Sequence, residues 1–436
     1  MIRQTVLGFK LEMTQEELTA HGGLALMAEY NHGMGLRGLV DRYLPEPGSN
    51  RGYAPSVYVD TLVLMLQGGG RSLEDLRELE REGGLMKLIG RDQIPDPDSV
   101  GDWLRRMGDP EKGLGGLGCV RDTLNQRILR WDGRKEYTLD ADAMQIEAEK
   151  REAHWTYQGL KGYMPMLGFL FETPVCLLDE FREGNVPPQA GQLAFYRECK
   201  ERMPVGKRIG GYRGDSASYQ ADLINELEVD EVLWAITADQ NSAVKAAILA
   251  LLEVEWKEPV VGCGYEIVET VHSMEKTENA FRLIIKRWVL PHRDLFEASS
   301  PKYGYHVVAS NWPREQKRAD EVLVWHNQRG QAENFNKELK SGLGLDRMPC
   351  GQFSANSVFF RIGVIAYNLF IGFKRLSCPE SWAHQTIGTF RWKLVQVAGR
   401  IVRHGGRVIL KLAVEAHDLA FFQGIRQRCF ELSVVT

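Results

Sequence analysis

Two aspartates, Asp140 and Asp142, lie two residues apart in LDADAM (139–144), a segment whose alternating pattern predicts a strand. Alternate side chains of a strand point to the same face, so both carboxylates share one face and the intervening apolar side chains the other. Burying carboxylates is costly unless they pair or bind a cation. The pair indicates either a strand end that reaches solvent or a cation site, and the segment alone leaves both interpretations open.

A third aspartate, Asp215, stands in YRGDSAS, after a predicted strand and before a predicted helix. In α/β proteins, the carboxyl ends of strands are where sites are built. Aspartate is also common as a helix N-cap or turn residue, which is the structural alternative here.

An acidic residue on a helix completes the set. In RGQAENFNKELK (329–340), helical spacing places Glu333 on one stripe with Arg329, Asn336 and Lys340. This stripe, which begins at His326, lies about a quarter turn from an apolar stripe, at the margin of the buried face. The apolar stripe consists of Ala332, Phe335, Leu339 and Leu343. A salt-bridged helix is the alternative, since such ion pairs contribute only ~0.2–0.5 kcal/mol each.

Together, two aspartates from strand ends and one helical glutamate can form an all-oxygen site for Mg²⁺. Two such ions, ~3.5–4 Å apart, would activate a water or a 3′-hydroxyl and stabilise the leaving oxygen of a phosphodiester. Arg329 and Lys340 flank Glu333 and could hold phosphates, arginine with a planar fork and lysine as a point charge. The combination therefore predicts phosphodiester chemistry.

In order and spacing these motifs resemble those of DDE transposases of bacterial insertion sequences, in the group with a Tyr-x2-Arg-x3-Glu-x6-Lys signature. The chain reproduces Arg329-x3-Glu333-x6-Lys340, with His326 at the tyrosine position, and matches the Gly-Asp-Ser motif at Asp215. LDADAM is similar to the first-Asp motif, although Met144 replaces the usual Thr or Ser. YQGLKGYMPMLGF, EGNVPP and the basic FRWKLVQVAGRIVRHGGRVILKL extend the resemblance over most of the chain from about residue 130.

The resemblance implies a catalytic site and its partners. It implies catalytic metal ligands at Asp142, Asp215 and Glu333, with Asp140 as the alternative first ligand. The DNA-phosphate contacts it implies are Arg329, Lys340, His326 and Lys337. The expected cofactor is Mg²⁺, with Mn²⁺ as a substitute. The expected partners are double-stranded DNA, as terminal inverted repeats and target, and a second copy in a homodimer. A catalytically degenerate DNA-binding repressor and a metal-dependent nuclease remain alternatives.

The elements that must position these residues predict a mixed α/β sheet preceded by an all-helical domain, and the resemblance implies that this sheet is ribonuclease H-like. Residues 1–130 read as helices, either for DNA-end binding through a helix-turn-helix or for packing alone. Three strands, a helix, a strand, a helix and a strand follow. The predicted domains are 1–130 (helical), 131–240 with 313–376 (catalytic core), 241–312 (β-rich insertion) and 377–436 (basic, helical, for DNA contact or dimerisation).

Basic residues beside a tryptophan mark one predicted strand of the insertion. Arg282, Lys286, Arg287 and Trp288 could grip a phosphate and stack on a displaced base. The favoured alternative is a strand with alternating exposed cations and a core tryptophan.

Composition sets the class of protein. The 436 residues suggest two or three domains, and 44% hydrophobic with 26% charged residues is ordinary for a globular protein. The net charge of −4 masks a basic C-terminal segment, in which residues 381–436 hold eight Lys or Arg against three Asp or Glu. Seven dispersed cysteines without a CxxC pair fit a reducing compartment. No signal peptide or membrane span is expected, so the predicted location is the cytoplasm, at the nucleoid during activity.

Overall fold

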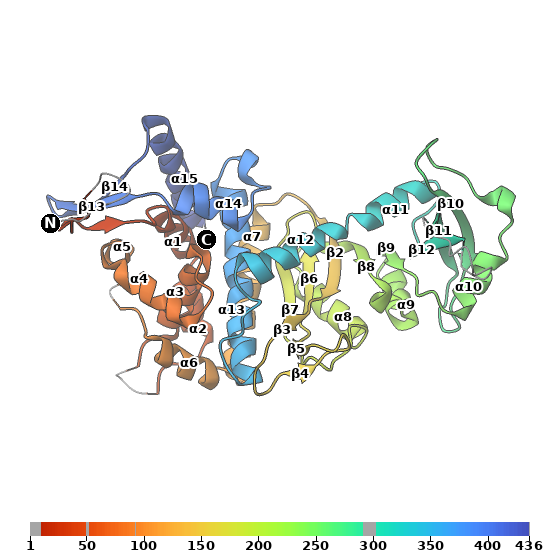
Figure 1. The fold of residues 1–436 in the computed structure, drawn as a ribbon, viewed down its shortest axis with the longest axis horizontal. Helices are drawn as coiled ribbons and strands as arrows, with labels where there is room; N and C mark the ends of the chain where they lie inside the picture. The colour runs from red at the N-terminus through yellow and green to blue at the C-terminus, as the bar shows by residue number, and fades with distance from the viewer. Residues whose placement is uncertain (1–9, 49–51, 92, 291–301, 436) are drawn as a thin grey trace.

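The protein is built around one large sheet, flanked by a helical lobe on one side and a smaller lobe on the other (Figure 1). The computed structural model describes residues 10–48, 52–91, 93–290 and 302–435. Residues 1–9, on which the expectation about a signal peptide partly rests, lie outside the described residues.

Five strands form the core of the sheet, in the order β7-β6-β2-β8-β9. They are β2 (Glu136–Ala143), β6 (Met166–Leu170), β7 (Cys176–Glu180), β8 (Arg208–Gly214) and β9 (Leu233–Thr237). The β2–β6 and β6–β7 pairs are antiparallel, whereas β2–β8 and β8–β9 are parallel. Helix α8 (Gln192–Arg202) connects β7 to β8, and α9 (Ala221–Val229) connects β8 to β9. This is the predicted ribonuclease H-like arrangement.

The insertion extends this same sheet. Its strands β10 (Glu266–His272), β11 (Phe281–Val289) and β12 (Tyr303–Ser310) are joined by antiparallel pairing, and α10 (Ser242–Leu249) precedes them. Strand β12 pairs with β9 from Val308↔Thr237 to Ser310↔Ala235. A strand edge that would expose unpaired backbone groups is thereby covered, since an open edge is prone to wrong pairing.

The helical stripe predicted from His326 to Lys340 is not carried by one continuous helix. Helix α11 (Ala319–Asn327) ends before Gln328, and α12 (Gly330–Lys337) follows it and leads into a wider turn at Glu338–Gly342. At the break, the amide of Ala332 donates to Arg329 O at 2.7 Å, a tight three-residue step. Gly330 disfavours a continuous helix at this point. The two helices lead from the insertion to the central sheet (Figure 1).

The N-terminal region is helical, apart from the two-residue strand β1 (Leu18–Thr19). Its helices are α1 (Leu24–Gly33), α2 (Leu36–Tyr43), α3 (Pro55–Gly68), α4 (Leu76–Arg81), α5 (Gly83–Leu88), α6 (Pro97–Arg106) and α7 (Gly115–Arg130). All but two residues of α3 are buried, so this helix packs and is not free to enter a DNA groove.

Helix α13 (Phe353–Gly372) is the core helix against which α3, α6 and α7 pack. With its last turn, to Ser377, it is long and apolar enough to cross a membrane, but 94% of its apolar window is buried inside the protein. A helix that is hydrophobic all round is typical of the core of a large protein.

The C-terminal region departs from the helical prediction. After α14 (Ile387–Phe390) the chain forms a hairpin of β13 (Gly399–His404) and β14 (Arg407–Leu412), then helix α15 (Ala416–Val435). The reason is the turn: Gly405 and Gly406 have φ values of +57° and +74°, which suit a tight hairpin. Strand β1 pairs with β13 and α15 packs on α1, so both ends of the chain share one lobe (Figure 1).

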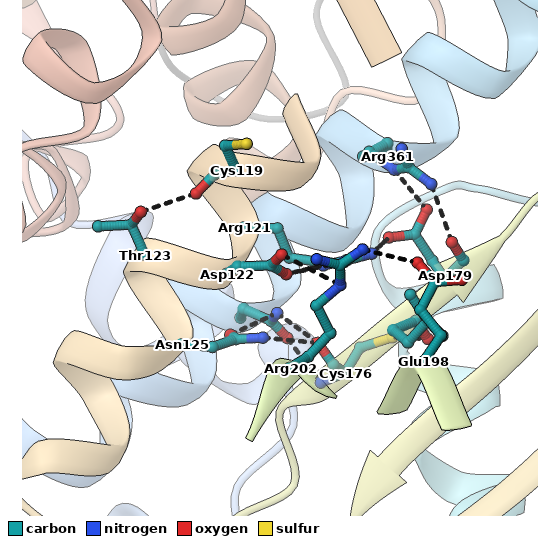
Figure 2. A network of polar contacts seen from close by, with 12 residues as sticks. Cys119, Arg121, Asp122, Thr123, Asn125, Cys176, Asp179, Glu198, Arg202 and Arg361 are labelled. Atoms are coloured by element: carbon teal, nitrogen blue, oxygen red, sulfur yellow. Dashed lines mark hydrogen bonds and ion pairs between the residues drawn. The ribbon is translucent and has the colours of Figure 1, made fainter. Parts of the chain in front are cut away.

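A buried ion network fixes the helical lobe to the edge of the sheet (Figure 2). Asp179 on β7 accepts hydrogen bonds from Arg121 of α7 at 2.5 Å and from Arg361 of α13 at 2.9 Å. Arg121 also pairs with Asp122, at 2.7 Å. Asp179 and Arg121 are nearly inaccessible to solvent, so removal of either one would leave the buried charge of the other with a single remaining partner, Arg361 for Asp179 or Asp122 for Arg121.

Candidate active site

The first two acidic motifs meet at one edge of the sheet. Strands β2 and β8 run parallel, and their register pairs Asp140 with Arg213. Two residues further on, Asp142 near the end of β2 and Asp215 just after β8 reach the same edge and the same face. Gly214 allows the chain to turn tightly at Asp215, since a Cβ at residue 214 would lie 2.5 Å from Ser218 Oγ.

Asp140 is fully engaged below this edge. Its carboxylate accepts two hydrogen bonds from Arg213, at 2.7 and 2.8 Å, and both side chains are wholly buried. The Arg213 guanidinium also donates to Trp325 O and lies 4.1 Å from the ring centre of Phe171. Burial raises the pKa of Asp140, and the hydrogen bonds from Arg213 oppose that effect. Asp140 is thus a structural ion-pair residue in this arrangement.

Asp142 has no such partner. Arg329 Nη1 lies 3.9 Å from its Oδ1, and Asn336 Nδ2 donates to its Oδ2 at 3.1 Å. Burial and the nearby carboxylates of Asp215 and Glu333 raise the pKa of Asp142 to about 7, although Arg329 acts in the opposite direction. Burial disfavours the charged carboxylate, and nearby carboxylates add to that effect. Asp215 and Glu333 therefore lie near enough to Asp142 to influence its protonation.

The other two carboxylates remain available. Asp215 Oδ1 accepts the amide of Ala217 at 2.9 Å, and this contact caps the short turn after β8. Glu333 lies on the exposed side of α12 and makes no hydrogen bond or ion pair with any residue that the structure describes. Neither carboxylate has a cationic partner that neutralises it, in contrast with Asp140.

Helix α12 is held across the sheet by contacts on both sides of its polar stripe. Phe335 packs against Phe169 of β6, with ring centres 5.5 Å apart. Asn336 reaches Asp142, and Lys340 Nζ donates to Gln145 O at 2.9 Å. These contacts fix Glu333 relative to the end of β2. The predicted apolar stripe is buried along the same helix, apart from the partly buried Phe335.

His326 occupies a different position from the one expected. It is buried, and its Nε2 lies 3.2 Å from Gly214 O and 3.2 Å from Thr237 Oγ1. Burial lowers its pKa to about 4, so the ring is neutral at pH 7. A contact to Gly214 O requires the proton on Nε2. His326 therefore supports the backbone just before Asp215 and is not exposed to a phosphate.

The other candidate contacts divide into two groups. Lys337 is exposed on α12, near the acidic cluster. In the insertion, Arg282 is buried and hydrogen-bonds Glu269, and Arg287 is buried between Glu253 and Glu266.

Trp288 lies over Gly304 of the neighbouring strand, where a Cβ would be 2.7 Å from its ring. The side chains of Arg282 and Arg287 are already engaged and are not free to take DNA. The alternative of exposed cations beside a core tryptophan is also wrong in detail, because both arginines are buried and Trp288 is only partly buried.

The carboxylate oxygens of Asp142, Asp215 and Glu333 suit a divalent cation that is bound by few protein ligands. Among the residues that the structure describes, no three His, Cys, Asp or Glu side chains are arranged to hold one metal ion. Mg²⁺ usually binds through one or two carboxylates and keeps several waters, so a pair of carboxylates suffices. Carboxylates that repel one another, with only the contact from Arg329 to Asp142 to neutralise them among the described residues, are the expected donor set.

Sequence reasoning missed two residues that shape this site. Arg213 neutralises Asp140, and Asn336 orients Asp142. The sequence held a signal for Arg213, which lies two residues before Asp215, just as Asp140 lies two residues before Asp142. If the two strands pair in parallel with the two aspartates level, Arg213 and Asp140 come side by side. Asn336 was visible on the Glu333 stripe, but its partner depends on how α12 crosses the sheet.

Comparison with known proteins identifies the family. The family described as Transposase DDE domain group 1 matches residues 8–434. Among solved structures, a piggyBac transposase in a synaptic complex with hairpin DNA is similar at 11% identity, with a TM-score of 0.49. The match covers 87% of this chain and 82% of that chain, a distant similarity. No curated protein sequence matches significantly.

Proposed function

This chain belongs to the group 1 DDE transposase family and is a DNA transposase, and from that premise we propose the details of its reaction. It binds the terminal inverted repeats of an insertion sequence as a homodimer. It then cleaves the strands at the element ends and joins the freed 3′ ends to target DNA, with Mg²⁺ as the cofactor and Mn²⁺ as a substitute. This takes place in the cytoplasm, at the nucleoid.

The observation that supports this proposal is the cluster of Asp142, Asp215 and Glu333. Burial, together with the carboxylates of Asp215 at the neighbouring strand end and Glu333 on the crossing helix, raises the pKa of Asp142 to about 7. Members of the family use a divalent metal, and oxygen donors of this kind are the ones Mg²⁺ prefers. A structural role would instead pair each acid with a cation, as happens at Asp140.

In the proposed reaction the chain positions DNA and places negative charge at the scissile phosphate. Asp142 together with Asp215 or Glu333 would hold a cation, and bound cations would activate the attacking oxygen and stabilise the leaving one. Arg329 lies at the margin of the cluster and can hold a phosphate by a fork of two hydrogen bonds. Lys337 offers an exposed charge on the same helix, and Lys340 would exchange its bond to Gln145 O for a phosphate.

Substitution of Glu333 by Gln tests the assignment. The change keeps size and removes the charge, so strand cleavage of a labelled end duplex should be lost while binding is retained. Glu315→Gln is the matched control, because Glu315 is exposed and its side chain makes no hydrogen bond or ion pair with any described residue. Cleavage that survives Glu333→Gln would contradict the site.

The same assay on the unmodified protein separates the alternatives. Cleavage followed by joining to a second duplex supports the transposase. Nicking without joining would indicate a plain nuclease, and binding without nicking would indicate a repressor.

A further inference from the structure

The β13–β14 hairpin carries an unusual solvent face. Cross-strand partners share a face of the sheet, and the register pairs Arg400 with Lys411 and His404 with Arg407. Between these pairs lies an apolar pair, Val402 and Ile409, the latter 39% exposed. One face of the hairpin thus presents basic side chains at both ends and a small apolar patch in the middle.

The opposite face explains why this one is free. Gly399, Ile401, Leu410 and Leu412 alternate with the basic residues and turn toward the helical lobe, where Ile401 is 4% exposed. At the tip of this inner face, Arg403 is exposed and lies 3.8 Å from Glu17. The hairpin is anchored on one side only.

Like charges directly opposite each other on a sheet are destabilising. On this face Glu16 forms an ion pair with Arg400, at 3.1 Å. Lys411 and Arg407 make no ion pair with any residue in the part of the chain that the structure describes. The free protein therefore carries a repulsion that an anionic partner would remove.

We propose that the outer face of the β13–β14 hairpin binds the backbone of duplex DNA, with Arg407 and Lys411 contacting phosphates and Val402 and Ile409 lying against the groove. This rests on the proposed function, and it names a DNA-binding surface separate from the acidic cluster. A two-stranded ribbon fits the major groove, which is about 12 Å wide. Six residues per strand give a ribbon about 20 Å long, enough to span the groove.

The position of the hairpin suits a contact away from the cleaved bond. It projects from the lobe that holds both chain ends, at the far end of the molecule from the insertion (Figure 1). Basic residues placed there would hold DNA beside the catalytic core, and they explain why the basic charge of the chain gathers in its last segment.

The test uses the full-length protein and a labelled duplex carrying an element end, with an unrelated duplex beside it, in fluorescence anisotropy. The double change Arg407→Ala with Lys411→Ala should raise Kd about 10-fold for both duplexes. It should also make the slope of log K against log salt less steep by about 1 for each cation removed. Both side chains are exposed, so the melting temperature should not fall, because like-charge repulsion is relieved.

A matched control removes two exposed cations at the other end of the molecule, Lys245→Ala with Lys257→Ala. Equal weakening by the control would show a general charge effect and overturn the inference. Unchanged binding and salt slope in the hairpin variant would overturn it as well, while the proposed function stands. A hairpin variant that dissociates from dimer to monomer would assign the face to contact between copies instead. If the unmodified protein binds neither duplex, the proposed function fails and this inference with it.

Discussion

Asp140 and Asp142 lie two residues apart on one strand and one face, yet their surroundings differ completely. Asp140 is wholly buried against Arg213, with two short hydrogen bonds. Asp142 faces two other carboxylates, with its nearest cation, Arg329, at 3.9 Å. The charge of Asp140 is compensated by Arg213, whereas the negative charge around Asp142 needs a further positive charge to compensate it.

This difference shows how a structural carboxylate can be distinguished from a functional one. Both are buried enough to be costly, so burial alone does not separate them. What separates them is whether the chain itself supplies the compensating cation. Where it does, the acid stabilises the fold, and where it does not, the site is built to receive a ligand.

The largest effect expected from this comparison is on catalysis. Asp142→Asn should lower the rate of strand cleavage on the order of 10³-fold or more, equivalent to about 4 kcal/mol of transition-state stabilisation. Asp140→Asn should leave a measurable rate in whatever fraction of the protein stays folded. Cleavage of a labelled end duplex, normalised to folded protein by circular dichroism, compares the two.

If Asp140→Asn abolished cleavage in fully folded protein while Asp142→Asn did not, the two roles would have to be exchanged. Binding of the duplex is the internal control, because neither change removes a cation that contacts phosphate.

The second effect is on stability. Asp140→Ala leaves Arg213 buried without its carboxylate, which should cost about 3–5 kcal/mol of unfolding free energy. Joint replacement, Asp140→Leu with Arg213→Met, should recover most of that loss, since apolar side chains can replace a buried pair. Urea unfolding followed by tryptophan fluorescence measures both. A loss below about 1 kcal/mol for the single change would mean that Arg213 finds another partner.

The sequence predicted the fold well, because apolar and polar residues alternate along its strands and because Gly, Asp and Asn mark its turns. The order of strands and helices, and the β-rich piece before the Glu333 helix, agree with the structure. The C-terminal hairpin was missed, because its basic residues were interpreted as a helix and the Gly405-Gly406 turn was not weighed. The break before Gly330 was missed for a similar reason, since a helical wheel assumes an unbroken helix.

The candidate site was harder to predict, because side-chain partners come from strands far apart in the chain. The choice between Asp140 and Asp142 depends on Arg213, which is 73 residues away from Asp140. His326 was expected to contact a DNA phosphate, but it is buried. Helical spacing predicts which side chains share a face of a helix, and it does not predict how deeply that face is buried. Arg282 and Arg287 likewise look exposed by alternation, but acidic residues on neighbouring segments enclose them.

A third effect concerns pH in the absence of metal. The pKa of Asp142 is raised to about 7, above the ordinary value of about 3.9 for aspartate in an unfolded chain. The folded state then binds more protons than the unfolded state between these values, so stability falls as pH rises through that window. Asp142→Asn removes the loss and should stabilise the metal-free protein by roughly 2–4 kcal/mol at pH 8, and by little at pH 4.

Urea unfolding in a chelating buffer at several pH values gives this profile. An unmodified protein whose stability stays flat from pH 4 to 8 would argue that Asp142 is paired after all. Addition of Mg²⁺ to the unmodified protein should restore the stability at pH 8, and should have little effect on the Asp142→Asn variant.

The smallest effect tests how weak the neutralisation of Asp142 is. Arg329 is 19% exposed and lies 3.9 Å from Asp142, so the ion pair should contribute about 1 kcal/mol or less. Arg329→Gln should therefore change overall stability little, but it should move the midpoint of the pH profile upward, because the one cation that lowers the pKa of Asp142 is gone. Arg208→Gln is the matched control: Arg208 pairs with Glu136 at the other end of the same two strands. The control should leave the midpoint in place, and a midpoint that moves equally in both variants would show that long-range charge, and not the local contact, sets the pKa of Asp142.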